Sequence, residues 1–441
     1  ITCRDWSSDV CSSDLSIGVK NVNELFNDIP DSIRIHGNLQ LSEGMDEISI
    51  TDKIEEIAGK NKQGKIFLGA GSYHHYVPPL VDYVVSRGEF LTAYTPYQPE
   101  ISQGTLRAIY DYQSMITILT GMDVANASMY DGATATAEAM LMACNMSGAE
   151  KKALVSDTIH PDYLAVLKTY AEVNNIEITL LKRKGLETDI EALEKLPSAG
   201  FSAFIIQSPN FFGSIENLSK IGKILSDKKI LFVCCVAEAM SLALLQPPGA
   251  FGAEITAGEA QSFGSRMNFG GPYLGFFAAK NQHVRRMPGR LVGKTTDKDG
   301  KTGYVLTLST REQHIRRDKA TSNICSNHNL CAVSACVYLA LMGKRLKDVA
   351  SLCFDRAHYL ADEIAKINGM SVENTSPFFN EFVVSCKNAE KVKQMLDEND
   401  FIAGYLLESQ FPEMKNKLLF CATEMNSIKD IDSLVQILKK A

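Results

Sequence analysis

The feature that most constrains the fold is a regular alternation of short apolar runs with helical segments, from about residue 65 to about residue 280. Between the runs, apolar residues recur three and four positions apart, which is typical of amphipathic helices. Strands that alternate with helices predict a mainly parallel sheet with helices on both faces. Such a sheet binds ligands beyond the carboxyl ends of its strands. The runs of strand length are 152–157, 176–183, 203–209, 230–237 and 273–280.

The character of the sequence changes on either side of this region. Residues 1–15 read like a translated sequencing adapter rather than protein, and we expect them to be an artefact. Residues 16–60 are short amphipathic pieces and predict an N-terminal helical arm. Residues 61–328 predict a large α/β domain, and 329–441 predict a linking helix and a small α+β domain. The overall class is therefore α/β with a smaller second domain.

The last helix has the clearest local signals. Ser427 and Asp430 have the spacing of a capping box, so the helix is expected to begin between them. Its expected apolar stripe consists of Ile431, Leu434, Val435 and Leu438.

Composition excludes several functions. The net charge of −7 means that the chain has no excess of basic residues to bind a phosphate backbone, so nucleic-acid binding is not expected. No run approaches the roughly 18 apolar residues of a membrane span, so no membrane association is expected. Two of the 11 cysteines fall within 1–15, and the others form no C-x-x-C pair. We expect buried free thiols in a cytoplasmic protein, with Cys234 and Cys235 on opposite faces of a strand.

A small-residue turn precedes one strong helical run. Asp131, Gly132, Ala133 and Thr134 stand directly before it. A glycine turn that opens a helix presents free backbone N–H groups, which is one way to hold a phosphate. The same residues also fit a plain N-cap, and the sequence leaves both interpretations open.

Two segments, 71–78 and 90–104, are dense in Tyr, His, Pro and Ser and have no regular period. They fit functional loops held by a rigid scaffold, or loops packed by their own aromatic side chains. His74 and His75 are each more simply structural than catalytic, and as neighbours they are a weak metal signal. We predict no metal site.

A third dense region, 307–325, concentrates basic and hydroxyl side chains. Guanidinium groups beside hydroxyls suit the recognition of carboxylates or phosphates. Ion pairs with the protein's own acidic residues are an equal alternative. The residues concerned are Arg311, His314, Arg316, Arg317, Lys319, Thr321, Ser322 and Asn323.

Several long stretches, in a fixed order, resemble one family. They are IGVKNVNELFNDIP, FLTAYTPYQPEISQGTL, GEAQSFGSRMNFGGPYLG, MPGRLVG and TREQHIRRDKATSNIC. These stretches are similar to those of alpha subunits (subunit 1) of the two-subunit bacterial glycine decarboxylase, the P-protein of the glycine cleavage system. The resemblance extends from about residue 17 to the C-terminus.

The resemblance implies a pyridoxal-phosphate-dependent transferase fold of the aspartate-aminotransferase type. It also implies a reaction in which glycine is decarboxylated and its aminomethyl group passes to the lipoyl arm of the H-protein. Pyridoxal phosphate is the electron sink of that chemistry. The implied partners are a beta subunit (subunit 2) and the lipoylated H-protein, in an α2β2 assembly.

A lysine holds this cofactor covalently, a few tens of residues after the strand whose carboxylate faces the pyridine nitrogen. Glu238 stands near the carboxylate position, but residues 230–279 contain no lysine. Matching the glycine-proline loop to the catalytic paralogue places Gln261 at the lysine position. Glutamine cannot form an imine, so we expect no catalytic residue on this chain and pyridoxal phosphate on the beta subunit. A self-sufficient enzyme would instead need Lys280 or Lys294.

Active sites of this fold type form at subunit interfaces, so the chain can still contribute groups to its partner's site. The alternative is a non-catalytic scaffold or regulatory subunit that stabilises the beta subunit and docks the carrier protein. The residues expected at the interface or substrate site are Tyr94, Tyr97, Arg311, Arg316, Thr321, Ser322 and Asn323.

Overall fold

The structure is a computed structural model that describes residues 18–20, 22–147, 151–197, 200–324 and 328–440. The predicted artefact at 1–15 lies outside the described residues. The chain forms two compact units, one ending at Gln63 and the other beginning at Gly64.

Within its described residues, the N-terminal unit contains helices joined by irregular segments. It contains two short 3-10 turns, η1 (Val22–Phe26) and η2 (Asp31–Ile33), and one longer helix, α2 (Glu47–Ala58). The carboxylate of Asp46 caps α2 by accepting the N–H of Ser49. No residue of α2 is buried, so this helix has no core of its own.

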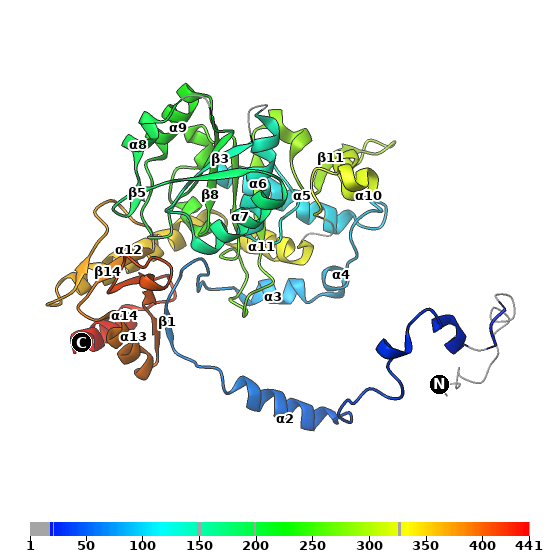
Figure 1. Cartoon of the computed structure of the whole chain (residues 1–441), viewed down its shortest axis with the longest axis horizontal. Helices are drawn as coiled ribbons and strands as arrows, with labels where there is room; N and C mark the ends of the chain where they lie inside the picture. Colours follow the sequence, from blue (N-terminus) through cyan, green and yellow to red (C-terminus); the bar gives the residue numbers. More distant parts are fainter. Residues whose placement is uncertain (1–17, 21, 148–150, 198–199, 325–327, 441) are drawn as a thin grey trace. The chain divides into compact units, whose positions relative to one another are not determined.

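The second unit is built on a seven-stranded sheet (Figure 1). Its neighbouring strands from β9 to β4 run parallel, while β10 is antiparallel to both β9 and β2. The sheet therefore has the mainly parallel order that the sequence predicts. In spatial order the strands are β2 (Val124–Ala125), β10 (Gly275–Ala279), β9 (Ile255–Glu259), β8 (Leu231–Val236), β7 (Ala203–Gln207), β3 (Lys152–Ser156) and β4 (Glu177–Leu181).

Successive residues of the central strands enter two different cores. On β3, Leu154 packs into the core beneath α5 (Gln103–Thr120), α9 (Leu218–Lys228) and α11 (Asn329–Met342). Its neighbour Val155 packs into the core beneath α6 (Gly132–Met146) and α7 (Pro161–Val173). The period of two in a strand produces this division.

The adjacent thiols on β8 follow the same rule. Cys234 lies in the first core and Cys235 in the second, as predicted. The eight cysteines that the structure describes are all free thiols, while Cys325 lies outside the described residues.

The C-terminal part is a small α+β layer. Helix α12 (Leu346–Ala365) leads into a four-stranded antiparallel sheet, and α13 (Ala389–Glu398) and α14 (Ile428–Leu438) pack with it. Ser427 and Asp430 form the predicted capping box on α14, and its predicted apolar stripe is buried. The sheet order is β13 (Ser371–Val372), β14 (Glu381–Ser385), β17 (Lys417–Cys421) and β16 (Tyr405–Leu406).

One strand lies in a different place from the one that its sequence position suggests. β1 (Lys65–Phe67), expected in the large domain because of its place in the chain, pairs in parallel with β15 (Phe401–Ala403). Phe67 is buried in the C-terminal core. The chain thus adds a strand to the C-terminal part before it forms the large sheet.

Candidate functional site

Two buried carboxylates stand at the carboxyl ends of neighbouring central strands. Glu238 follows β8 after one residue, and Glu259 is the last residue of β9. Their exposed fractions are 2% and 3%. This edge of a parallel sheet is where the fold class binds its ligands.

Glu259 binds the first turn of α6. Its Oε2 accepts the N–H of Gly132 at 2.9 Å, and its Oε1 accepts the N–H groups of Gln261 and Leu274, each at 3.0 Å. Burial raises the pKa of this carboxyl to about 7, against these three donors, which favour the charged form. The helix N-terminus is therefore already bound by a carboxyl group of the chain itself.

There is little free space at this helix terminus. A Cβ added to Gly132 would lie 2.1 Å from the Tyr163 Oη and 2.8 Å from the backbone nitrogen of Glu259. Asp131 and Thr134 form a reciprocal capping box on the same turn. Of the two interpretations left open for residues 131–134, the structure has the plain N-cap, with Glu259 as a second acceptor.

Gln261 uses its whole side-chain amide inside the protein. Its Nε2 donates to the backbone oxygens of Tyr73 at 3.0 Å and Ser265 at 2.7 Å, and its Oε1 accepts the N–H of Tyr73 at 3.0 Å. The side chain is buried, with 1% of the residue exposed. Gln261 therefore ties the 71–78 loop to the turn that follows β9.

His75, from the same loop, joins two carboxylates. Its Nε2 lies 3.1 Å from Glu238 and its Nδ1 lies 2.8 Å from Glu424. Burial opposes charge on the ring, yet the two carboxylates together raise the pKa of His75 well above its ordinary value. Each ring nitrogen faces a carboxylate oxygen, and this arrangement favours the imidazolium, the form that can donate from both nitrogens. The Ser262 hydroxyl also donates to Glu238, at 2.8 Å.

The same cluster brings ligand-type atoms of His75, Cys353 and Glu424 within 4.8 Å of one another. Both ring nitrogens of His75 are already used in hydrogen bonds to Glu238 and Glu424. The Cys353 thiol also donates to Glu424, at 3.2 Å. A hydrogen-bonded ionic cluster explains these contacts without a metal.

Residues 69–73, which lead into the 71–78 loop, also contact β14 of the C-terminal layer and His160. The Tyr73 hydroxyl donates to the buried carboxylate of Glu381 at 2.7 Å, and the N–H of Ala70 donates to the same group at 2.6 Å. The loop passes so close to His160 that a Cβ on Gly71 would lie 2.7 Å from Nε2 of that ring. Burial raises the pKa of Glu381 to about 7.

Tyr94 and Tyr97, predicted at an interface, lie together on the surface. Their ring centroids are 6.2 Å apart, and their exposed fractions are 80% and 39%. Both line a hollow of about 480 Å³, together with the exposed Ile101. This is an open surface with aromatic groups, unlike the closed edge of the sheet.

Sequence reasoning missed the group that supports Tyr97. The Arg290 guanidinium lies 4.8 Å from the Tyr97 ring centroid and donates to the Tyr97 hydroxyl at 2.6 Å. Arg290 also pairs with the buried Glu312 at 3.3 Å, and the His314 ring packs on Tyr97 at 5.6 Å. Among the described residues, Arg290 Nη1 and Glu312 Oε1 have no hydrogen-bond partner. The signal was available, since Arg290 falls within the MPGRLVG stretch.

The remaining predicted residues separate into two groups. Arg311 is buried, and its guanidinium donates to the backbone oxygens of Met287, Gly289 and Leu308, so it binds the chain itself. The other four lie at or near the surface. Of these, Arg316, Thr321 and Asn323 are exposed, and Ser322 is half-buried.

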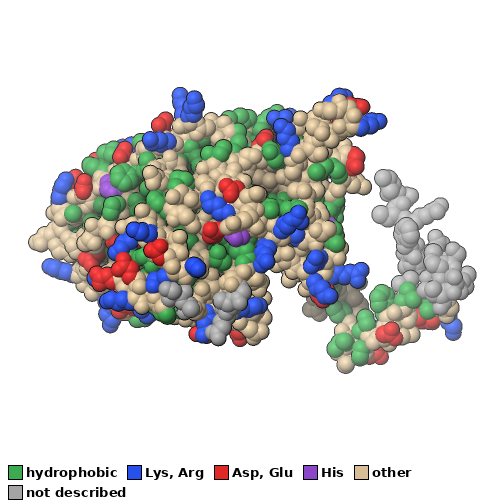
Figure 2. Space-filling view, turned by 90° about the horizontal axis from the view of Figure 1, so that it is seen from above, with side chains coloured by type: hydrophobic (Ala, Val, Ile, Leu, Met, Phe, Trp, Pro, Cys, Tyr) green, Lys and Arg blue, Asp and Glu red, His purple; other side chains and the backbone are tan. Residues whose placement is uncertain are grey.

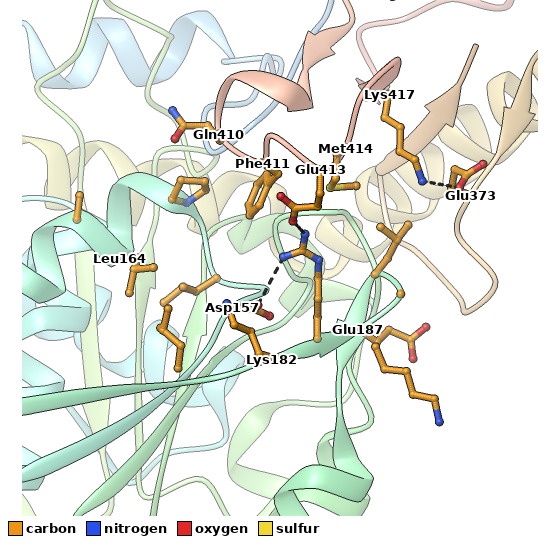
Figure 3. Close-up of a pocket in the computed structure, with 18 of the residues that line it drawn as sticks. Asp157, Leu164, Lys182, Glu187, Glu373, Gln410, Phe411, Glu413, Met414 and Lys417 are labelled. Atoms are coloured by element: carbon orange, nitrogen blue, oxygen red, sulfur yellow. Dashed lines mark hydrogen bonds and ion pairs between the residues drawn. The ribbon is translucent and has the colours of Figure 1, made fainter. Parts of the chain in front are cut away.

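One cavity, of about 890 Å³, lies between residues 180–187 and residues 410–417 (Figure 3). Several of its charged side chains pair with one another. Arg183 bridges Asp157 at 3.6 Å and Glu413, and Lys417 pairs with Glu373 at 2.7 Å. The cleft therefore presents balanced charge rather than an anion site.

The surface charge is also mixed on a larger scale. Figure 2 shows Lys and Arg side chains scattered among Asp and Glu on the face in view. Among the described helices, none has both the length and the apolar character needed to cross a bilayer.

The sheet, the helix that starts at Gly132 and the carboxylates behind β8 and β9 define the pyridoxal-phosphate-dependent transferase fold of the aspartate-aminotransferase type. A sphingosine-1-phosphate lyase of Burkholderia pseudomallei K96243 shares this fold. Its TM-score is 0.67 at 13% identity, over 92% of each chain.

Closer similarity identifies the family. The model of the glycine cleavage system P-protein matches residues 9–438, and the chain belongs to that family. A crystal structure of glycine decarboxylase (P-protein) in inhibitor-bound form superposes with a TM-score of 0.89 at 40% identity, over 97% of each chain.

Two relatives carry the name "Probable glycine dehydrogenase (decarboxylating) subunit 1". The protein of Moorella thermoacetica is 50% identical, over 96% of this chain and 95% of its own. The protein of Bacillus mycoides is 47% identical, over 95% of this chain and 94% of its own.

The cofactor of this fold does not fit the residues of this chain. Its phosphate requires free helix N–H groups, but Glu259 binds the N–H of Gly132. Its pyridine nitrogen requires a free carboxylate, but Glu238 is bound by His75 and Ser262. This edge of the sheet therefore offers pyridoxal phosphate neither a free helix N-terminus nor a free carboxylate.

Neither alternative lysine reaches this site. Lys280 follows the antiparallel β10, and its N–H bonds to the backbone oxygen of Glu254, just before β9 begins. It therefore lies at the opposite edge of the sheet from Glu259. Lys294 is exposed on the hairpin of β11 (Leu291–Thr296) and β12 (Thr302–Thr307). The self-sufficient enzyme is therefore not supported.

Proposed function

We propose that this chain acts as subunit 1 of a two-subunit glycine decarboxylase and that its partner supplies the cofactor chemistry. The complex decarboxylates glycine and transfers the aminomethyl group to the lipoyl arm of the H-protein. One observation carries the proposal. In this member of the P-protein family, the side chains of Glu259, Gln261 and His75 fill the carboxyl edge of the sheet, where the fold binds its cofactor. Turnover then requires a second chain whose site is open.

The cofactor in this proposal is held by a lysine of the beta subunit. Two facts about this chain support that assignment. Residues 230–279 contain no lysine, and the side chain at the expected position, Gln261, is buried and fully hydrogen-bonded. Pyridoxal phosphate supplies the electron sink when it is bound to the partner.

The contribution of this chain is a positioning surface around Tyr97. Tyr94 and Tyr97 are exposed, and Arg290, which pairs with Glu312, donates a hydrogen bond to the Tyr97 hydroxyl. Aromatic and arginine side chains of this kind are typical of the centre of protein interfaces. Arg311, whose guanidinium binds backbone oxygens of the chain, supports this surface from within. The proposed interface or substrate residues are Tyr94, Tyr97, Arg316, Thr321, Ser322 and Asn323, in an α2β2 assembly that receives the lipoylated H-protein.

Borohydride trapping tests the cofactor assignment. The purified chain, the beta subunit and the mixed complex are each incubated with pyridoxal phosphate and reduced, and the labelled peptide is identified by mass spectrometry. Label on the beta subunit alone is expected. Specific label on a lysine of this chain would overturn the assignment.

Substitution tests the positioning surface. Tyr97→Phe, Arg316→Ala and Thr321→Ala are assembled with the beta subunit, and glycine decarboxylation is measured beside complex formation. The matched control is Lys184→Ala, which removes an exposed cation paired with Glu191 at 3.2 Å. At least a tenfold loss of turnover or assembly, about 1.4 kcal/mol, is expected for one of the three. Unchanged turnover and assembly in all three would refute the surface.

A further inference from the structure

The closed edge of the sheet contains two charged contacts that resemble those of a bound cofactor. One is an anion at a helix N-terminus, and the other is an aromatic cation on a strand-end carboxylate. They lie close together, because the 259–262 turn joins them. Within it, the N–H of Gln261 donates to Glu259 and the hydroxyl of Ser262 donates to Glu238.

The anionic contact involves Glu259. Its two oxygens accept three backbone N–H groups, from Gly132, Gln261 and Leu274, and the residue is 3% exposed. A phosphate at a helix N-terminus uses its oxygens in the same way. Helix capping alone does not explain Glu259, because Asp131 already forms a complete capping box on α6.

The cationic contact involves His75. Its ring donates to Glu238 at 3.1 Å, where a protonated pyridine nitrogen would donate to the strand-end carboxylate of this fold. The opposite ring nitrogen donates to Glu424 at 2.8 Å. A buried ionic cluster of this kind is rarely required for stability, since apolar side chains of the same size stabilise a core at least as well.

We propose that Glu259 and His75 are built-in substitutes for the two charged ends of pyridoxal phosphate. The Glu259 carboxylate takes the place of the phosphate at α6, and the His75 imidazolium takes the place of the pyridinium at Glu238. The fold thereby keeps its cofactor-dependent polar groups satisfied while carrying no cofactor. The inference goes beyond the proposed function, because it holds whether or not the mixed complex acts on glycine.

Inorganic phosphate tests the anionic half. Glu259→Ala, in the full chain, leaves three backbone donors facing the space that the carboxylate filled. Glu259→Gln is the matched control, because it removes the charge but still fills the space. Thermal unfolding of both variants and of the wild type is measured at increasing phosphate, with chloride at equal ionic strength as reference.

We expect phosphate to raise the Tm of Glu259→Ala in a saturable way, by about 2 °C or more, and to leave the other two proteins unchanged. Equal responses in all three proteins, or none in Glu259→Ala, would overturn the anionic half. If Glu259→Ala is not recovered folded in chloride, its recovery in phosphate decides: folding only with phosphate supports the substitution, and failure in both buffers refutes it.

Imidazole tests the cationic half. His75→Ala leaves Glu238 and Glu424 buried without their shared cation. The matched control is His283→Ala, since His283 pairs with Glu254 at 2.6 Å in a more exposed place. We expect imidazole to raise the Tm of His75→Ala but not of His283→Ala. Imidazole that raises neither, or both equally, would refute the cationic half. Neither measurement involves glycine turnover, so these failures are separate from failure of the proposed function.

Discussion

The carboxyl edge of the large sheet and the surface around Tyr97 differ in how completely their buried charged groups are hydrogen-bonded. At the sheet edge, Glu259 and His75 are buried, and their hydrogen bonds go to backbone N–H groups and to carboxylates. At the surface, Arg290 and Glu312 are also buried, yet each has a polar atom with no hydrogen-bond partner among the described residues, beside the half-exposed Tyr97. The chain has therefore filled the ligand-binding edge of its sheet with its own side chains, whereas the surface around Tyr97 is open.

The strongest test of the closed edge is removal of His75. His75→Ala should lower the free energy of unfolding by about 3–5 kcal/mol, because it leaves two carboxylates without the cation between them. Denaturant unfolding of the isolated chain measures the change. A loss below about 1 kcal/mol would mean that the edge is not held by this cluster.

A second test concerns the lack of space at the start of α6. Gly132→Ala should cost about 1–3 kcal/mol, because its Cβ would meet the Tyr163 hydroxyl at 2.1 Å. Adding Tyr163→Phe should recover part of that loss, which a double-mutant cycle measures by denaturant unfolding. Additive effects of the two substitutions would show that the hydroxyl is not the obstacle.

The pH dependence of stability gives a third test. Burial raises the pKa of Glu381 to about 7 from its ordinary value of 4.5. In the unfolded chain this group ionises first, so its contribution to stability falls as pH rises from about 4.5 to about 7. The slope for one such group is at most about 1.4 kcal/mol per pH unit.

Glu381→Gln removes this titration. The wild type should therefore lose stability relative to Glu381→Gln between pH 5 and pH 7, as measured by denaturant unfolding at each pH. Parallel curves for the two proteins would contradict the raised pKa. The same series with Glu373→Gln is the control, because the Lys417 partner lowers the pKa of that partly buried carboxyl instead.

The smallest effect on stability is expected at the open surface. Tyr94→Ala should change the free energy of unfolding by less than about 0.5 kcal/mol, because 80% of the residue is exposed. The same substitution should weaken assembly with the beta subunit if the surface is an interface. Chemical denaturation and analytical ultracentrifugation of the mixed chains separate the two effects, and a large loss of stability with normal assembly would reverse the comparison.

Much of the local structure could be predicted from the sequence. The runs at 152–157 and 203–209 became β3 and β7, and the capping pair Ser427 and Asp430 begins α14. These signals are short-range, because periodicity and capping depend on residues within a few positions of one another. The sequence also indicated the loop that carries Tyr94 and Tyr97, since a segment dense in aromatic side chains can be recognised without a fold, whereas the role of the two tyrosines at an interface stays a prediction.

The closed site could be predicted only in part. The absence of lysine from 230–279 indicated that this chain does not hold its cofactor, and the glycine turn at 132 indicated a helix N-terminus able to bind an anion. The sequence did not show which anion binds there, because a carboxylate of the chain and a bound phosphate would both accept hydrogen bonds from the same backbone N–H groups of the turn. Arg290 was overlooked although it falls within the MPGRLVG stretch, because the sequence does not reveal that its partners are Tyr97 and Glu312.

By itself, the sequence determined the alternation of strands and helices, the two faces of each central strand and the absence of a lysine after β8. The tertiary structure decided that Glu259 reaches Gly132, 127 residues away, and that His75 reaches Glu424, 349 residues away. The reason is physical. Local periodicity depends on side chains that are neighbours in the sequence. A buried ion pair depends instead on which distant segments lie side by side, and only the packing of the whole unit determines that.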